Sequence, residues 1–298
     1  MTAFDFDDVT VLTSDDGEPV ALHDLGGPAD GPPLLLSHGN GLNVGMWAAA
    51  IPDLAERFRC YGVDLRGHGR SRPTGTGYPV GRERFAADLI TAIDAIGGPV
   101  CFAGHSLGAA SAVQACLLDG TNAARLFTGL WLFEPVLVPD GFERGEGPSF
   151  LIEMSRKRRM EFDSVDDAIE RFGSKPPFAG CDPASVRGYV EVGTVPTESG
   201  VRLSCEGEDE ARVFETMATL DFTRLASVGL PTMVVSGAAA DVANALPPKL
   251  APLVADAMGP SARWVEFDGL SHFGPMEAPG LIARSITGFF DEVITADN

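Results

Sequence analysis

A serine flanked by two glycines is the clearest chemical feature of the sequence. Gly104-His105-Ser106-Leu107-Gly108 has the pattern G-x-S-x-G, follows the apolar run Pro99–Ala103 and precedes the small residues Ala109–Ala112. Such a serine occupies a strained turn from strand to helix, where side chains in place of the two glycines would collide with it. The first amides of the helix face developing negative charge. The motif therefore predicts that Ser106 attacks a carbonyl carbon.

The motif lies within an alternation of short apolar runs and longer segments with helical spacing. Arg82–Ile96 is an amphipathic helix in this pattern, and Leu107–Asp119 is a helix rich in alanine. An alternation of this kind predicts βαβ units and a parallel sheet. The expected strands are Leu34–Ser37, Cys60–Val63, Val100–Ala103, Leu130–Phe133, Thr232–Ser236 and Arg263–Phe267.

Residues 139–226 interrupt this alternation. The segment is polar and charged, is punctuated by glycine and proline, and has helical patches but no evident strand. The sequence therefore predicts a core built from residues 1–138 and 227–298, with a helical insertion at 139–226. The insertion contains the basic run Arg156–Arg159. This run is either the solvated face of a helix, paired with nearby acidic residues, or a group of charges that attracts an anionic substrate.

Composition narrows the function classes. The chain has 298 residues, 45% of them hydrophobic, and a formal net charge of −20. Such a charge repels nucleic acids and anionic membranes. The sequence contains no run of 18 apolar residues, so it predicts no membrane span. The first ten residues are acidic, unlike a signal peptide, and the five cysteines form no disulfide or zinc pattern, so we expect a reduced, cytoplasmic protein. No motif predicts a metal or a cofactor.

Three further motifs accompany the serine in a fixed order. They are Ser37-His38-Gly39-Asn40-Gly41, Asp64-Leu65-Arg66-Gly67-His68-Gly69-Arg70-Ser71 and the run Ser271–Pro279. Together with the G-x-S-x-G motif, they make the chain resemble the α/β-hydrolase superfamily over nearly its whole length. The resemblance implies a mostly parallel sheet of eight strands, flanked by helices and covered by a helical cap.

The resemblance also implies catalytic roles. His272 follows the last strand, as the chain order serine, acid, histidine requires, and would be the general base. The backbone N–H groups of Asn40 and Leu107 would form the oxyanion hole, and the Asn40 side chain is an alternative donor.

Two carboxylates could be the acid that orients His272. Asp241 follows the strand Thr232–Ser236, where the family usually places its acid, although the linker between them is unusually rich in alanine. Glu134 ends an earlier strand, where some members of the superfamily place it instead. We expect Asp241 and keep Glu134 as the alternative. Either would hold the histidine tautomer and stabilise its protonated form.

The expected reaction is hydrolysis of a small, largely apolar ester or lactone through an acyl-enzyme on Ser106. Thioesters and carbon–carbon bonds are alternatives on the same residues, and a cofactor-free lyase, a perhydrolase or a non-catalytic receptor for a small ligand are others. The expected pocket residues flank the catalytic loops and are Asn43, Trp47, Val136, Leu137 and Phe273.

Overall fold

The central feature of the fold is a sheet of eight strands. A computed structural model of the chain describes residues 6–73, 75–118, 122–143, 147–217, 219–238 and 246–296. The strands lie in the order β1-β2-β4-β3-β5-β6-β12-β13; the pairs β1–β2 and β2–β4 are antiparallel, and the other five pairs are parallel. The predicted sheet is confirmed. Its strands are β1 (Val9–Thr13), β2 (Pro19–Asp24), β3 (Pro33–Ser37), β4 (Arg59–Asp64), β5 (Val100–His105), β6 (Phe127–Phe133), β12 (Thr232–Gly237) and β13 (Ala262–Phe267).

Successive residues of the central strands face two separate hydrophobic cores. In β6, Leu130 and Leu132 belong to one core, whereas Trp131 and Phe133 belong to the other. Side chains alternate between the faces of a strand, so a sheet covered on both faces produces strands that are apolar at almost every position. This explains why the strands appeared in the sequence as continuous apolar runs.

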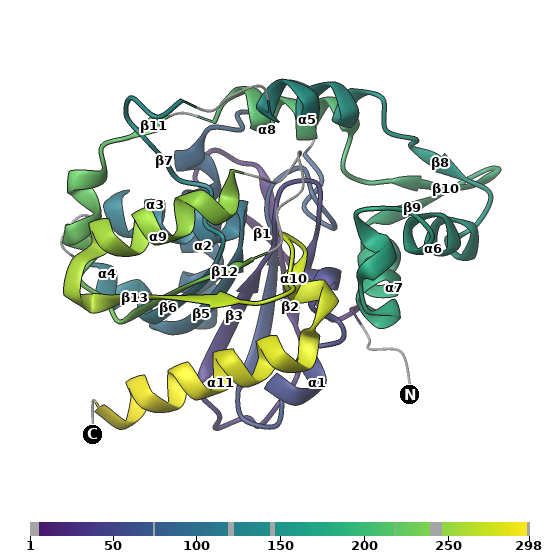
Figure 1. The fold of residues 1–298 in the computed structure, drawn as a ribbon. Coiled ribbons are helices and arrows are strands. Elements are labelled where there is room, and N and C mark those ends of the chain that lie inside the picture. Colours follow the sequence, from purple (N-terminus) through teal and green to yellow (C-terminus); the bar gives the residue numbers. More distant parts are fainter. Residues whose placement is uncertain are drawn as a thin grey trace.

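Helices cover both faces of this sheet (Figure 1). The first core packs beneath α2, α3 and α9, and the second packs beneath η1, α1 and α11. The elements outside the insertion are η1 (Val44–Trp47), α1 (Ile51–Leu54), α2 (Arg82–Ile96), α3 (Leu107–Leu118), α4 (Ala123–Leu126), α9 (Pro247–Met258), η4 (Gly259–Ser261), α10 (Gly274–Glu277) and α11 (Pro279–Ala296).

The segment between β6 and β12 differs from the all-helical insertion that the sequence predicts. It contains a three-stranded sheet in the order β8-β10-β9 and a two-stranded pair, β11–β7. Strands of two to four residues are too short to show an alternating pattern, which is why the sequence did not reveal them. The elements are β7 (Val138–Pro139), α5 (Gly147–Arg156), β8 (Glu161–Phe162), α6 (Val165–Gly173), η2 (Phe178–Gly180), α7 (Pro183–Val192), β9 (Thr194–Thr197), β10 (Gly200–Leu203), α8 (Gly207–Glu215), β11 (Thr219–Leu220) and η3 (Phe222–Val228).

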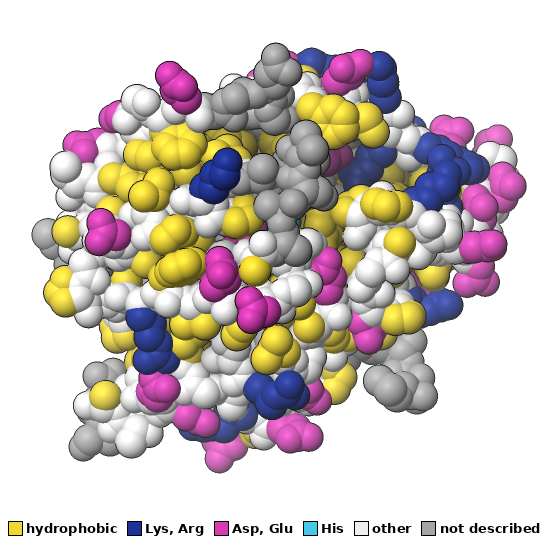
Figure 2. Space-filling model, in the orientation of Figure 1, with side chains coloured by type: hydrophobic (Ala, Val, Ile, Leu, Met, Phe, Trp, Pro, Cys, Tyr) yellow, Lys and Arg dark blue, Asp and Glu magenta, His cyan; other side chains and the backbone are white. Residues whose placement is uncertain are grey.

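Figure 1 shows the insertion over one end of the sheet, with α5 and α8 along the top and α6, α7 and β8–β10 at the right. In Figure 2, basic side chains gather at the upper right over this segment, and acidic ones surround them. Of the predicted basic run, Arg156 pairs with Glu208 and Glu215 of α8, and Lys157 pairs with Glu153. Among the described helices, none is long and apolar enough to cross a membrane.

Candidate active site

The serine motif forms a tight turn at the end of β5. Ser106 has φ = +52°, a conformation that residues with a side chain rarely adopt. A Cβ atom on Gly104 would lie 2.9 Å from the Ala109 nitrogen, and one on Gly108 would lie 2.5 Å from Ser37 Oγ. A side chain at either position would therefore clash, although with residues around the turn and not, as the motif predicts, with Ser106 itself. Strain of this kind persists where the surrounding structure enforces it, and it concentrates at functional sites.

Glu134 is the second strained residue. Within the described residues, it is the only other non-glycine residue with a positive φ, at +45°, and its side chain is fully buried. Its Oε2 atom lies 2.5 Å from Nδ1 of His272. A carboxylate oxygen can only accept a hydrogen bond, so Nδ1 carries the proton and Nε2 of a neutral ring is left unprotonated.

Backbone pairing brings these groups together. The Ser106 N–H donates to the Phe133 carbonyl (2.9 Å), next to Glu134, and the Glu134 N–H donates to Val235 of β12 (2.8 Å). The remaining oxygen of Glu134 accepts from the Gly237 N–H (2.9 Å). Glu134 therefore extends from the end of β6 to the end of the adjacent strand β12, after which the acid was expected.

His105, the variable residue of the motif, holds the loop of His272. Its Nε2–H donates to the His272 carbonyl (2.8 Å), and the two ring centroids lie 4.6 Å apart. Burial and the neighbouring His272 keep the pKa of His105 well below its ordinary value, so the ring is neutral. From the other side, Glu277 accepts from the Ser271 N–H (2.8 Å) and its hydroxyl. We call Ser106, Glu134, His105 and His272 the elbow cluster.

Two backbone N–H groups beside Ser106 have no acceptor within the described part of the chain: those of Asn40 and Leu107. The Leu107 group begins α3. The Gly39 carbonyl accepts from the His38 Nδ1–H (2.8 Å) and the Leu42 N–H (3.1 Å). A trans peptide points its N–H opposite to its carbonyl, so these bonds also fix the direction of the Asn40 N–H.

A pocket opens onto these groups. Ser106, Leu107 and Asn40 lie in its wall, and most of the remaining wall is apolar. Its other lining residues are Val80, Arg82, Phe85, Ala110, Val136, Val213, Phe214, Thr216 and Met217. The strained serine and the two unused N–H donors thus line an apolar cavity, and backbone pairing places the buried histidine–carboxylate pair next to the serine motif.

Comparison with known proteins identifies the family and the fold. The profile of the alpha/beta hydrolase family matches residues 34–285. The chain belongs to this family. The solved structure of an E-2-(acetamidomethylene)succinate hydrolase superposes on this chain with a TM-score of 0.78 and 21% sequence identity. The superposition covers 95% of this chain and 98% of the solved one.

Two curated relatives match over shorter stretches. A magnesium-chelatase 30 kDa subunit from Rhodobacter capsulatus is 41% identical over 105 residues, 33% of this chain and 37% of the relative. Protein phosphatase methylesterase 1 from Mus musculus is 31% identical over 148 residues, 48% of this chain and 36% of the relative. The match spans little more than a third of either relative.

The hydrolase places only one of the five expected pocket residues in the pocket wall, namely Val136. Asn43 caps η1 by accepting from the Gly45 N–H and donates to the Tyr189 carbonyl. Trp47 is fully buried and donates to the Ser37 carbonyl. Leu137 is a core residue, and Phe273 packs edge-on against Phe178. A residue close to a catalytic loop in the sequence can still point its side chain into the core. Closeness in the sequence was therefore a poor guide to which residues line the pocket.

Asp241, the expected acid, lies outside the described residues. The sequence analysis missed the role of His105, whose hydrogen bond joins residues 167 positions apart in the chain and leaves no local pattern. It also missed the role of Glu277, which holds Ser271 within the same loop. It also missed the pocket wall contributed by Val213 and Phe214 of α8. The Asn40 side chain, an alternative oxyanion donor, instead donates to the Glu210 carbonyl (3.0 Å).

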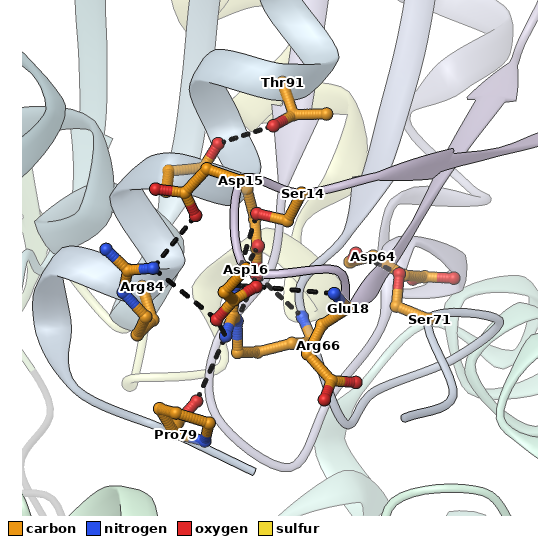
Figure 3. Close-up of polar contacts among 12 residues, drawn as sticks. Ser14, Asp15, Asp16, Glu18, Asp64, Arg66, Ser71, Pro79, Arg84 and Thr91 are labelled. Carbon is orange, nitrogen blue, oxygen red and sulfur yellow. Dashed lines mark hydrogen bonds and ion pairs between the residues drawn. The ribbon is translucent and has the colours of Figure 1, made fainter. Parts of the chain in front are cut away.

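A second buried polar group, the anchoring cluster, lies around the loop after β4 and comprises His23, His38, Asp64, Arg66 and Asp88. Arg66 is fully buried and pairs with Asp88 (2.6 Å) and Asp16 (2.7 Å), as Figure 3 shows in part. Burial opposes the charge of Asp64, but His23 at 2.8 Å and nearby hydrogen bonds hold its pKa at about 2. Among the described residues, no group of three or more His, Cys, Asp or Glu could hold a metal ion.

Proposed function

We propose that the protein is a serine hydrolase that cleaves carboxylic esters through an acyl-enzyme on Ser106, with His272 as base and Glu134 as the acid. The observation that carries this proposal is the buried Glu134–His272 pair, joined through paired backbone to the strained serine at the pocket. This arrangement has the three roles that a catalytic triad needs: nucleophile, base and orienting carboxylate.

The first half of the reaction forms the acyl-enzyme. His272 Nε2 takes the proton of the Ser106 hydroxyl as the oxygen bonds to the carbonyl carbon. The resulting oxyanion accepts from the N–H groups of Asn40 and Leu107, each typically worth about 10²–10³ in rate. When the tetrahedral intermediate collapses, the protonated ring gives its proton to the leaving alkoxide, and the alcohol departs.

The second half releases the acid. Water gives a proton to His272 and adds to the acyl carbon, and collapse returns that proton to Ser106. Within the described residues, the Ser106 hydroxyl has no hydrogen-bond partner. Proton transfer to His272 therefore requires the two side chains to approach one another with substrate bound, as catalytic hydrogen bonds often do.

Glu134 is our choice of acid over Asp241 because of its contacts. Both of its oxygens are engaged, one by His272 and the other by Gly237. The β6 and β12 strands are neighbours, and adjacent strands lie only about 5 Å apart, so a longer side chain on β6 reaches the site expected for an acid after β12.

The pocket supports an apolar acyl group. Its wall contains Phe85, Val136, Val213, Phe214 and Met217, and its polar members are Asn40, Arg82, Ser106 and Thr216. Such a site would bury an aliphatic or aromatic acyl chain and leave a short alcohol near the nucleophile. The similarity to a protein phosphatase methylesterase supports a simple ester as the bond cleaved.

The test is a panel of p-nitrophenyl and methyl esters, lactones and acyl thioesters, combined with labelling by a fluorophosphonate. We expect ester turnover and labelling in the wild type, and the loss of both in Ser106→Ala, with turnover falling by about 10⁵–10⁶-fold. Faster turnover of lactones or thioesters would change the substrate class. Tight ligand binding without turnover or labelling would identify a receptor and overturn the proposal.

A further inference from the structure

Three residues of the insertion contact the loop of residues 38–44, which we call the oxyanion loop. Arg158 follows α5, Tyr189 lies in α7 and Glu210 lies in α8. Arg158 donates to Glu210 (2.6 Å) and to the Tyr189 hydroxyl (2.8 Å). These three residues form what we call the insertion clamp.

The clamp contacts the loop next to the oxyanion donor. Arg158 Nη2 lies 3.4 Å from the Gly41 carbonyl oxygen, and the Tyr189 hydroxyl donates to the same oxygen (3.3 Å). The backbone carbonyl of Glu210 accepts from the Asn40 side chain. All of these contacts fall on Asn40 or on the residue that follows it.

The core holds the same loop from below. The Gly41 N–H donates to His68 Nε2 (3.0 Å), whose Nδ1–H donates to the Arg66 carbonyl (2.9 Å). Gly41 itself has φ = +73°, and a Cβ atom on it would lie 2.4 Å from a carboxylate oxygen of Glu210. The loop is thus held between the core and the insertion, and the insertion clamp makes the contacts from the insertion side.

The clamp is a charged pair kept away from water. The side chains of Arg158 and Glu210 are only 15% and 14% exposed. Burial works against the charge of Arg158, but Glu210 and Tyr189 raise its pKa. A buried cation that loses its partners is costly, so the clamp has one favourable arrangement and holds the loop to it.

We propose that Arg158, with Glu210 and Tyr189, is a positioning residue for the oxyanion hole. The insertion then controls stabilisation of the tetrahedral intermediate in addition to lining the pocket. This inference rests on the proposed function, since it requires that the Asn40 N–H serve as an oxyanion donor. It predicts that loosening the clamp lowers kcat and leaves substrate affinity nearly unchanged.

Arg156 provides a matched control two residues away. It belongs to the same basic run, is 41% exposed and pairs with Glu208 and Glu215 of α8. Within the described residues, the hydrogen bonds of Arg156 reach Glu208 and Glu215, and none reaches residues 38–44. Arg156→Met therefore removes an arginine that joins α5 to α8 and leaves the loop contacts intact.

The experiment measures kcat and KM for Arg158→Met, Arg158→Lys, Tyr189→Phe and Arg156→Met with the best ester of the panel. We expect kcat to fall about 10–100-fold in Arg158→Met, a part of the 10²–10³ that a whole oxyanion donor supplies, with KM within about twofold. Arg158→Lys should recover part of the loss, because lysine keeps the charge but not the forked donors. Arg156→Met should match the wild type.

Two further readouts separate positioning from folding. A boronic acid that forms a tetrahedral adduct with serine should bind Arg158→Met more weakly, by about the factor lost in kcat. Tyr189→Phe removes only a hydroxyl and should lower kcat by about three- to tenfold, so it tests the clamp even where Arg158→Met fails to fold.

Unchanged kcat in Tyr189→Phe and Arg158→Met, or an equal loss in Arg156→Met, would overturn the clamp while leaving the esterase intact. A wild-type protein with no ester turnover and no fluorophosphonate labelling would instead overturn the proposed function, and the clamp with it.

Discussion

The elbow cluster and the anchoring cluster are both buried and both contain a histidine paired with a carboxylate, yet they differ in how completely their groups are used. Asp64 accepts from His23, the Val44 N–H and the Arg70 N–H, and Arg66 donates to two carboxylates. In the elbow cluster, the Ser106 hydroxyl lacks a partner among the described residues, and His105 Nδ1 is buried without one.

Backbone strain and access to a cavity separate the clusters further. Among the residues that the structure describes, the two positive φ values at non-glycine residues fall at Ser106 and Glu134, and the pocket opens at Ser106. The anchoring cluster has neither feature. Burial and ion pairing alone therefore do not mark a site; unused polar groups on a strained backbone beside a cavity do.

Among the tests of this comparison, the largest effect should come from Glu134→Gln. The amide nearly keeps the shape of the carboxylate but no longer favours the Nδ1–H tautomer or the protonated ring, so we expect kcat to fall about 10³–10⁴-fold. Steady-state ester hydrolysis measures this loss. Asp241→Asn is the control and should stay within about threefold of the wild type. The reverse ranking would return the acid to Asp241.

Arg66→Met should act on stability instead. It leaves Asp88 buried without its partner, and breaking a buried ion pair in this way typically costs about 3–5 kcal/mol of the free energy of unfolding. Urea unfolding measures the change. The kcat of the folded fraction should change less than tenfold, well short of the loss in Glu134→Gln.

The double variant Arg66→Met/Asp88→Leu sharpens this test. It removes both charges, so a large part of the lost stability should return. A kcat loss in Arg66→Met as large as that in Glu134→Gln would erase the distinction between the two clusters.

The sequence predicted the sheet and the serine turn because both depend on local patterns. Continuous apolar runs identify strands covered on two faces, and G-x-S-x-G fixes a turn that only glycine permits. The carboxylate that pairs with His272 could come from the end of either of two adjacent strands. In the structure, Glu134 at the end of β6 contacts the His272 ring. Strand adjacency is a tertiary property that spacing in the chain does not encode.

The insertion was harder to predict for a related reason. Its strands are short, and its contributions to the pocket, Val213 and Phe214, lie about a hundred residues from Ser106 in the chain. Arg158 resembles its exposed neighbours in sequence, although the fold buries it against Glu210. Its contacts with α7, α8 and the Gly41 carbonyl distinguish Arg158 from the other three basic residues.

Acid should weaken both clusters together. Burial, followed by repulsion from His68, lowers the pKa of His38 to about 3, and burial also lowers the pKa values of His68 and His105. In the unfolded chain these rings bind protons below about pH 6.5, whereas in the folded protein they stay neutral down to a lower pH. Their stabilisation is therefore complete above pH 6.5 and is lost as the pH falls toward the folded pKa values.

Each such histidine contributes a slope of about 1.4 kcal/mol per pH unit inside this window. Urea unfolding at pH 7.5, 6.5, 5.5 and 5.0 measures the total slope, and ring proton shifts in NMR show whether the histidines stay neutral in the folded protein. Stability that is constant from pH 7.5 to 5.0 would contradict the neutral, buried rings that the two clusters share.

The smallest effect should come from an ion pair outside both clusters. Lys157 and Glu153 pair one turn apart on the surface, with side chains 67% and 63% exposed. Water and salt screen such a pair, so Lys157→Ala should leave the free energy of unfolding, measured in urea, and kcat unaltered within the error of the measurements. Lys157 is the neighbour of Arg158, whose replacement should lower kcat. A measurable kcat loss in Lys157→Ala would mean that catalysis responds to the charge of the whole basic run, and burial would no longer explain why Arg158 differs from Lys157.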